Sequence, residues 1–123
     1  MRRRIEARRC SITQGGTDCV VNASNETATL GGGVSRALFD ECGGKTFQQE
    51  MRTKLEEDFG DALEQDDCLI TSAGTSSKFR FVLHVPAVDY RLRKRGQAPT
   101  SVSRIQSCTQ AALGAAADLG ERE

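Results

Sequence analysis

The stretch VVNASNETATLGGGVSRALF, residues 20–39, places three consecutive glycines between two regular elements. The apolar run DCVVN at 18–22 follows the turn signal QGGT and predicts a buried strand, whereas the residues after the glycines have helical spacing. Glycine loses more conformational freedom on folding than any other residue, so a triplet marks a special backbone shape or a close approach to another group. The chain must therefore fold around a unit of strand, glycine loop and helix.

The other elements follow from apolar periodicity and from turn residues. Thr46, with Gln49 three residues later, has the pattern of a capping box and predicts the start of the second helix. Weak alternation predicts a first strand or strand edge over 5–9, and the basic segment 93–99 is predicted to be a loop. Helices are predicted over 34–42, from Thr46 to about Phe59 and from Ser101 to Gly120, and strands over 68–74 and 79–85. The apolar face of the second helix is predicted to consist of Phe47, Met51, Leu55 and Phe59, and that of the third helix of Val102, Ile105, Cys108, Ala112 and Ala116.

Strands that alternate with helices predict a three-layer α/β/α fold, in which a mixed, largely parallel sheet lies between layers of helices. The 123 residues suit a single domain, 1–123, with a modest core built mainly from aliphatic side chains. In such sheets ligands bind in the crevice at the carboxyl ends of the strands. The glycine triplet follows such an end, so it is the first candidate for a binding site.

Composition narrows the range of functions and compartments. Seventeen Lys and Arg residues balance seventeen Asp and Glu residues, which gives no reason to expect a nucleic-acid or membrane partner. The five cysteines are widely spaced and lack the pattern of a zinc site or a disulfide framework, so no metal or cofactor is expected and the thiols are predicted to be reduced. Without a signal peptide or an apolar membrane span, a cytoplasmic or nuclear location is expected.

Residues 31–34, GGGV, directly precede a helix, where backbone N–H groups and the positive end of the helix dipole suit a phosphate. The dinucleotide-binding pattern GxGxxG and the P-loop pattern are both absent, and a triplet alone is more commonly a flexible surface loop. Two asparagines stand between the strand and the glycines. Asn22, at the strand end, is expected to brace the backbone, and Asn25, closer to the glycines, is expected to hydrogen-bond a ligand.

The segment DCVVNASNETATLGGGVSRAL, 18–38, resembles the signature of the macro domain, a module that binds ADP-ribose. Three other segments agree with that family in order and spacing. CSIT at 10–13 stands where the family has Gly-Asp-Ile-Thr, DDCLITSAG at 66–74 is similar to its strand ending in Ile-Thr and a glycine, and FRFVLHVP at 79–86 is similar to its strand ending in Ile-His and a proline. The helix over 101–119 resembles the helix that follows.

This resemblance implies the residues of a binding site. Ile12 would flank the adenine, and Asn25 would hydrogen-bond the distal ribose. Ser11 stands where the family commonly has an aspartate that accepts a hydrogen bond from adenine, and Ser35 stands where one hydrolase branch has an aspartate that activates water. Neutral hydroxyls make weaker partners in both places. Backbone N–H groups would be offered to the ribose and the diphosphate by Gly31, Gly32, Gly33 and Val34.

The leading hypothesis is binding of ADP-ribose, either free or linked to a protein. One alternative is an enzyme, an ADP-ribosyl-protein hydrolase or an O-acetyl-ADP-ribose deacetylase, in which Asn25 would position the ribose for attack by water. Another is a degenerate macro fold that serves as an interaction module. The family's next strand and second phosphate loop find no match before Glu123, so the domain is expected to be truncated at its C-terminus. The single histidine, His84, is expected to be a satisfied residue at the end of the sheet.

Overall fold

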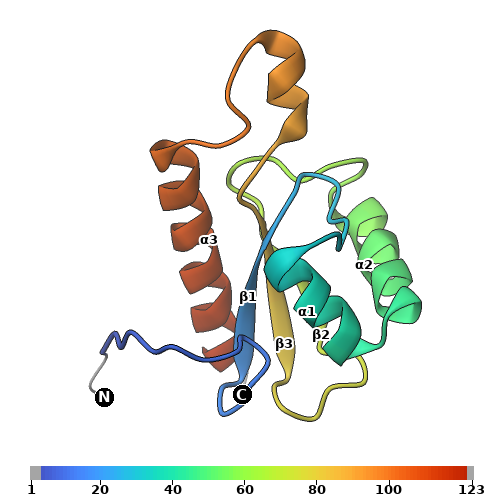
Figure 1. Ribbon diagram of the computed structural model, residues 1–123, viewed down its shortest axis with the longest axis vertical. Helices are drawn as coiled ribbons and strands as arrows, with labels where there is room; N and C mark the ends of the chain where they lie inside the picture. The colour runs from blue at the N-terminus through green and yellow to red at the C-terminus, as the bar shows by residue number, and fades with distance from the viewer. Residues whose placement is uncertain (1–3, 122–123) are drawn as a thin grey trace.

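The computed structural model describes residues 4–121. In chain order its elements are β1 Cys19–Ser24, α1 Gly33–Cys42, α2 Lys45–Asp58, β2 Leu69–Ser72, β3 Phe81–Pro86, the 3-10 helix η1 Tyr90–Arg95 and α3 Val102–Glu121. The sheet lies between α3 on one side and α1 and α2 on the other (Figure 1). This arrangement confirms the predicted three-layer α/β fold.

The three strands form a mixed sheet in the order β1-β3-β2. β1 and β3 are parallel, with Cys19 opposite Phe81 and Ser24 opposite Pro86, and β2 runs antiparallel to β3. The antiparallel pair arises because only residues 73–80 separate β2 from β3, whereas a parallel connection needs about a dozen residues or more. Parallel pairing brings the carboxyl ends of β1 and β3 to one edge of the sheet, where the chain departs for the glycine loop and for η1.

Apolar side chains fill the two sides of the sheet unequally. The larger cluster lies on the side of α1 and α2, and it includes Leu38 and the predicted α2 face of Phe47, Met51 and Leu55. Fully burying one such side chain contributes about 1.5–3 kcal/mol. The smaller cluster lies beneath α3 and consists of Val85, Cys108 and Ala112, with Cys68 packed against it. The side of α1 and α2 is therefore the main core of the domain.

The expected strand over 5–9 and the expected capping box are both wrong. Residues 5–9 are irregular and exposed, and no described strand pairs with them. α2 begins at Lys45 with Gly44 as its N-cap and has no side-chain cap. Gly44 has φ +64°, and its N–H donates to the carbonyl oxygen of Phe39, so the chain turns from α1 into α2 before Thr46 is reached. Thr46 consequently lies inside the helix.

Two predictions for the last third of the chain are also corrected. The segment 93–99 is not entirely a loop, because its first three residues belong to η1. Val102 and Ile105, expected on the buried face of α3, are 77% and 47% exposed, since this helix meets the core through Cys108 and Ala112. Within residues 4–121, no helix combines the length and the apolar character that crossing a membrane requires.

The end of α1 lies directly against the turn that follows β2. Thr75 donates its backbone N–H to the carbonyl oxygen of Cys42 at 3.0 Å. Gly74 has φ +59°, and a Cβ atom at this position would overlap the same carbonyl oxygen. Glycine is thus required at 74 for two separate reasons, the backbone conformation and the close contact.

We expect Gly74→Ala to destabilise the protein by about 3 kcal/mol or more. A left-handed backbone costs about 1–2 kcal/mol for a residue with a Cβ atom, and overpacking adds about 1–3 kcal/mol. Gly96→Ala is the matched control, because Gly96 has φ +73° but no atom within 4 Å of an added Cβ. Urea denaturation of the two variants measures the difference. Equal losses of stability would contradict a role for the contact with Cys42.

Candidate functional site

Asn25, the first residue after β1, organises the loop that leads to the glycines. Its side-chain Oδ1 accepts hydrogen bonds from the backbone N–H of Thr29 at 2.9 Å and from the hydroxyl of Thr27 at 3.2 Å. Its Nδ2 makes one long hydrogen bond, 3.4 Å, to the carbonyl oxygen of Thr29. The oxygen of Asn25 therefore braces its own loop, and an N–H of the amide is left for another acceptor.

Gln48 of α2 holds the same loop from the other side. Its Oε1 accepts from the backbone N–H of Leu30 at 2.7 Å, and its Nε2 donates to the carbonyl oxygen of Ala28 at 3.0 Å. A single side chain thus replaces the two hydrogen bonds that a neighbouring strand would supply. Gln48 could not be predicted from the sequence, because nothing in an isolated helix distinguishes this glutamine from its surface neighbours Gln49 and Glu50.

The three glycines differ in what requires them. Gly33 has φ +57°, a conformation that favours glycine. Gly31 and Gly32 have no such requirement, and Gly32 is extended, with φ −156°. A Cβ atom at Gly31 or Gly32 would meet no protein atom within 4 Å. Neither backbone shape nor crowding within the described chain explains glycine at these two positions, which face open space.

The start of α1 lies beside this open space. Gly32 is the N-cap, no side chain caps the helix, and the first turn contains no acidic residue. The first N–H groups of a helix have no partner inside the helix, and together with the helix dipole they favour an anion. The predicted geometry for phosphate binding, a glycine loop leading into a helix N-terminus, is therefore present.

Four polar side chains form a hydrogen-bonded series behind the loop. The Ser35 hydroxyl donates to Asn22 Oδ1 at 2.9 Å, Asn22 Nδ2 lies 3.0 Å from His84 Nδ1, and His84 Nε2 lies 2.9 Å from Thr71 Oγ1. Because Asn22 Oδ1 is the acceptor for Ser35, its Nδ2 must donate to His84, which therefore carries its proton on Nε2. Asn22 and His84 are both fully buried. Both residues have the structural role predicted for them, but the partners of Asn22 are side chains and not the backbone that it was expected to brace. Both also lie within a strand, β1 or β3, rather than at its end.

This series decides the chemistry available to Ser35. Its hydroxyl proton is committed to a buried amide, and only 7% of the residue is exposed. An amide oxygen cannot accept a proton outright, so Asn22 does not activate the hydroxyl as a base or a nucleophile. Ser35 thus positions the first turn of α1.

The eight predicted site residues line two hollows on either side of the glycine loop. The larger hollow, about 980 Å³, lies between β1 and the N-terminal segment and is lined in part by Ser11, Ile12, Gly33 and Val34. The smaller hollow, about 190 Å³, is lined in part by Asn25, Gly31, Gly32 and Ser35. Ser11 forms a local turn in the first hollow, because its Oγ accepts from the backbone N–H of Thr13 at 3.2 Å.

The smaller hollow has a second wall, formed by residues that the sequence does not single out. Val88 and Tyr90 follow β3, and Ser24 closes β1. The Ser24 hydroxyl is buried and has no hydrogen-bond partner within the described residues. No local pattern marks Val88 or Tyr90. They reach the site because β1 and β3 pair in parallel, a long-range arrangement that could have been inferred only from the paired strand ends.

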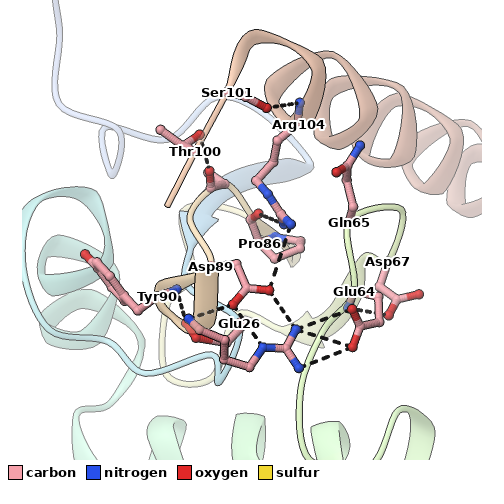
Figure 2. A network of polar contacts seen from close by, with 12 residues as sticks. Glu26, Glu64, Gln65, Asp67, Pro86, Asp89, Tyr90, Thr100, Ser101 and Arg104 are labelled. Carbon is pink, nitrogen blue, oxygen red and sulfur yellow. Dashed lines mark hydrogen bonds and ion pairs between the residues drawn. The ribbon is translucent and has the colours of Figure 1, made fainter. Parts of the chain in front are cut away.

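A network of polar contacts fixes this second wall (Figure 2). Glu26, 4% exposed, accepts the backbone N–H of Tyr90 at 3.0 Å. Asp89, 3% exposed, accepts from the Arg91 guanidinium at 2.7 and 2.9 Å, and these hydrogen bonds are the largest cause of the lowered pKa of Asp89. Arg104 of α3 donates to the carbonyl oxygen of Pro86 at 3.0 Å. The wall is consequently held by the loop after β1, by the N-cap of η1 and by α3.

Two cysteines away from the hollows are poorly suited to act as nucleophiles. All five are free thiols, and only Cys10, which lines the larger hollow, is exposed. Burial raises the pKa of Cys42 and of Cys68 to about 11, which disfavours the nucleophilic thiolate. Within residues 4–121, no group of three or more His, Cys, Asp or Glu side chains is arranged to hold a metal ion.

A family model described as "Macro domain" matches residues 21–122 of the sequence. The chain belongs to the macro domain family. Members of this family bind ADP-ribose. This macro domain is 30% identical over 113 residues to an uncharacterized protein of Aquifex aeolicus, a match that covers 92% of the chain and 58% of the relative.

Solved macrodomain structures from Oceanobacillus iheyensis share the fold. One, with ADP, is 28% identical with a TM-score of 0.64, and the match covers 85% of this chain and 53% of that one. A mutant with ADPR is 22% identical with a TM-score of 0.67, covering 85% and 54%. The chain therefore spans little more than half the length of the proteins that it matches.

The buried histidine makes the stability of this macro domain depend on pH. Burial lowers the pKa of His84 from 6.5 to about 3. Below about pH 6.5 the unfolded chain takes up a proton at His84 and the folded chain does not. As the pH is lowered, the free energy of unfolding therefore decreases by about 1.4 kcal/mol per pH unit until the pKa of the folded state is approached.

Urea denaturation between pH 7 and about pH 5 tests this dependence, because ordinary carboxylates titrate mainly below that window. We expect His84→Gln to flatten the fall in stability across the window, whatever its effect at pH 7. Parallel pH profiles for the variant and the natural sequence would contradict a neutral, buried His84.

Proposed function

We propose that this macro domain binds ADP-ribose across the glycine loop. The observation that carries the proposal is that Gly31 and Gly32 face open space, between two hollows, with no structural need for glycine. Side chains at these positions would keep a ligand away from the backbone N–H groups at the start of α1. Glycine there is explained by a ligand that approaches the backbone closely.

The two hollows divide the ligand between them. The diphosphate lies over the loop and the first turn of α1, the adenosine end occupies the larger hollow beside Ser11 and Ile12, and the distal ribose occupies the smaller hollow beside Asn25. The amide N–H of Asn25 that the loop leaves available suits a ribose hydroxyl. The unpartnered Ser24 hydroxyl lies in the wall of the same hollow and is a second polar group suited to the ribose.

The smaller hollow favours binding over hydrolysis. Among the described residues that line it, none has a carboxylate or an imidazole that could take a proton from water. The Ser35 hydroxyl is held by Asn22, so it offers no base either. We therefore rank a hydrolase or a deacetylase below a binding module for free or protein-linked ADP-ribose.

Isothermal titration with ADP-ribose tests the proposal, with ADP and AMP as controls for the contribution of the distal ribose. We expect micromolar binding that is tighter for ADP-ribose than for ADP or AMP. An assay for release of ADP-ribose from a modified protein, run on the same sample, should show none. Folded protein that gives no heat with millimolar ADP-ribose would contradict the proposal.

Two substitutions locate the site. Asn25→Ala should weaken binding about tenfold, since a lost hydrogen bond is worth about 1 kcal/mol and the loop also loses its brace. Gly31→Ala should weaken binding without destabilising the fold, because the added methyl meets only open space.

The control for Gly31→Ala is Gly114→Ala. Gly114 lies in α3, on the opposite side of the sheet, and an added methyl there also meets no atom within 4 Å. We expect this control to bind ADP-ribose as the natural sequence does. If Gly31→Ala and Gly114→Ala bind equally well, the ligand does not approach the loop backbone.

A further inference from the structure

One charged surface of the molecule takes no part in the site described above. η1 projects beyond the sheet at the end where β1 and β3 finish (Figure 1). Its last turn consists of Arg93, Lys94 and Arg95, all of them exposed. The chain as a whole has no net charge, so this is a local surplus of positive charge.

The surplus is not neutralised within the described part of the chain. Arg91, at the start of η1, is paired with Asp89 and Glu64. Arg93, Lys94 and Arg95 form no ion pair with a described carboxylate, and the recorded contact of Arg93 is with the ring of Tyr90, at 4.8 Å. Three neighbouring cations without counter-charges repel one another unless an anion is present.

This surface adjoins the smaller hollow. A 3-10 helix has three residues per turn, so residues three apart lie on the same side, and Arg93 is on the side of Tyr90. Tyr90 lines the hollow and is 47% exposed, and Figure 2 shows its ring pointing away from the ion pairs that anchor the backbone. Arg93 therefore lies at the edge of the hollow, and the ring of Tyr90 separates it from the proposed ribose position.

Hydrogen bonds hold the backbone of η1 at both ends. Asp89 caps the helix by accepting the backbone N–H of Arg91 at 3.0 Å, and its own N–H donates to the carbonyl oxygen of Pro99 at 2.7 Å. At the other end Gly96 takes a left-handed conformation, and its N–H reaches the carbonyl oxygen of Arg93 at 3.1 Å. Because the backbone that carries the cations is already ordered, only their side chains lose entropy when they pair with an anion.

We propose that Arg93 and Lys94 bind acidic residues that flank an ADP-ribosylated residue of a partner protein. The inference rests on the proposed function, because it places the modified residue next to the ribose in the smaller hollow. A chain leaving that hollow past Tyr90 meets Arg93 first. Carboxylates on the adjacent residues of the partner can then form ion pairs with the cations of η1. The domain would thus prefer partner proteins with acidic residues around the modified residue.

An acidic protein segment fits better than a single-stranded nucleic acid. Binding of unpaired bases relies on several aromatic side chains that stack successive bases. Tyr90 is the only tyrosine of the chain, there is no tryptophan, and one face of its ring is occupied by Arg93. The surface therefore offers positive charge without a stacking platform, which suits carboxylates.

The test compares free ADP-ribose with two synthetic peptides that carry ADP-ribose on one serine, flanked by Asp and Glu in one peptide and by Asn and Gln in the other. At low salt the acidic peptide should bind roughly three- to tenfold more tightly than the neutral one, the range for a few exposed ion pairs. Raising the salt concentration should narrow the difference. The double variant R93Q/K94Q should abolish it while free ADP-ribose still binds. The double variant K45Q/R52Q removes the same charge from exposed positions of α2 and should preserve the difference.

Each result decides the matter. Equal affinity for the two peptides, with free ADP-ribose bound, would overturn the inference and leave the proposed function standing. An oligonucleotide that competes with the acidic peptide and depends equally on Arg93 would assign the surface to nucleic acid instead. Failure of free ADP-ribose and of both peptides to bind would overturn the proposed function and this inference together.

Discussion

A series of four buried hydrogen-bonding side chains sets the positions of the other parts of this macro domain. Ser35, Asn22, His84 and Thr71 connect the first turn of α1 to β1, β3 and β2. A buried polar group that loses its hydrogen-bond partner destabilises the fold by about 1–3 kcal/mol. Each element is therefore kept in place by its hydrogen bond to the next. A shift of α1 by one residue would leave Asn22 Oδ1 without its donor. The need to pair buried polar groups, and not only apolar packing, thus decides where α1 begins and where the glycine loop ends.

The parallel pairing of β1 with β3 then assembles the site from distant parts of the chain. Ser24 lies opposite Pro86, so the residues after each strand leave the sheet side by side. One set becomes the loop braced by Asn25, and the other becomes the wall that carries Tyr90. The wall needs its own supports, from Glu26 and Asp89, because a segment outside the sheet has no ladder of backbone hydrogen bonds to hold it.

How far the sequence predicts this structure depends on the range of the interactions involved. The strand at 18–22, the helix after the glycines and the buried stripe of α2 follow from local periodicity, and the structure has all three. A structural role for Asn22 also follows from the sequence, but its side-chain partners Ser35 and His84 do not. Local sequence patterns gave wrong predictions where the rest of the structure imposed another conformation. Gly44 started α2 before Thr46 could cap it, and residues 5–9 alternate without a strand to pair with.

The candidate site shows the same division. Every residue taken from the Asn and glycine motif lines one of the two hollows, because the motif is a continuous segment. Gln48, Val88 and Tyr90 escaped notice, since each reaches the site through tertiary packing and none has a distinctive local context. The sequence predicts a ligand-binding role for Asn25, whereas its side-chain oxygen braces the loop, a role that depends on the positions of Thr27 and Thr29 in space.

Ala28 shows what the bracing achieves. It is the one described residue other than glycine with a positive φ, +55°, and it is completely buried. Such a backbone costs about 1–2 kcal/mol, and it persists because Asn25 and Gln48 hold the loop around it. The loop is therefore preorganised. Its conformational entropy is lost when the protein folds and not when a ligand binds, so a ligand meets a surface already in its final shape. Affinity at such a loop is governed by the contacts it offers and hardly at all by any rearrangement on arrival.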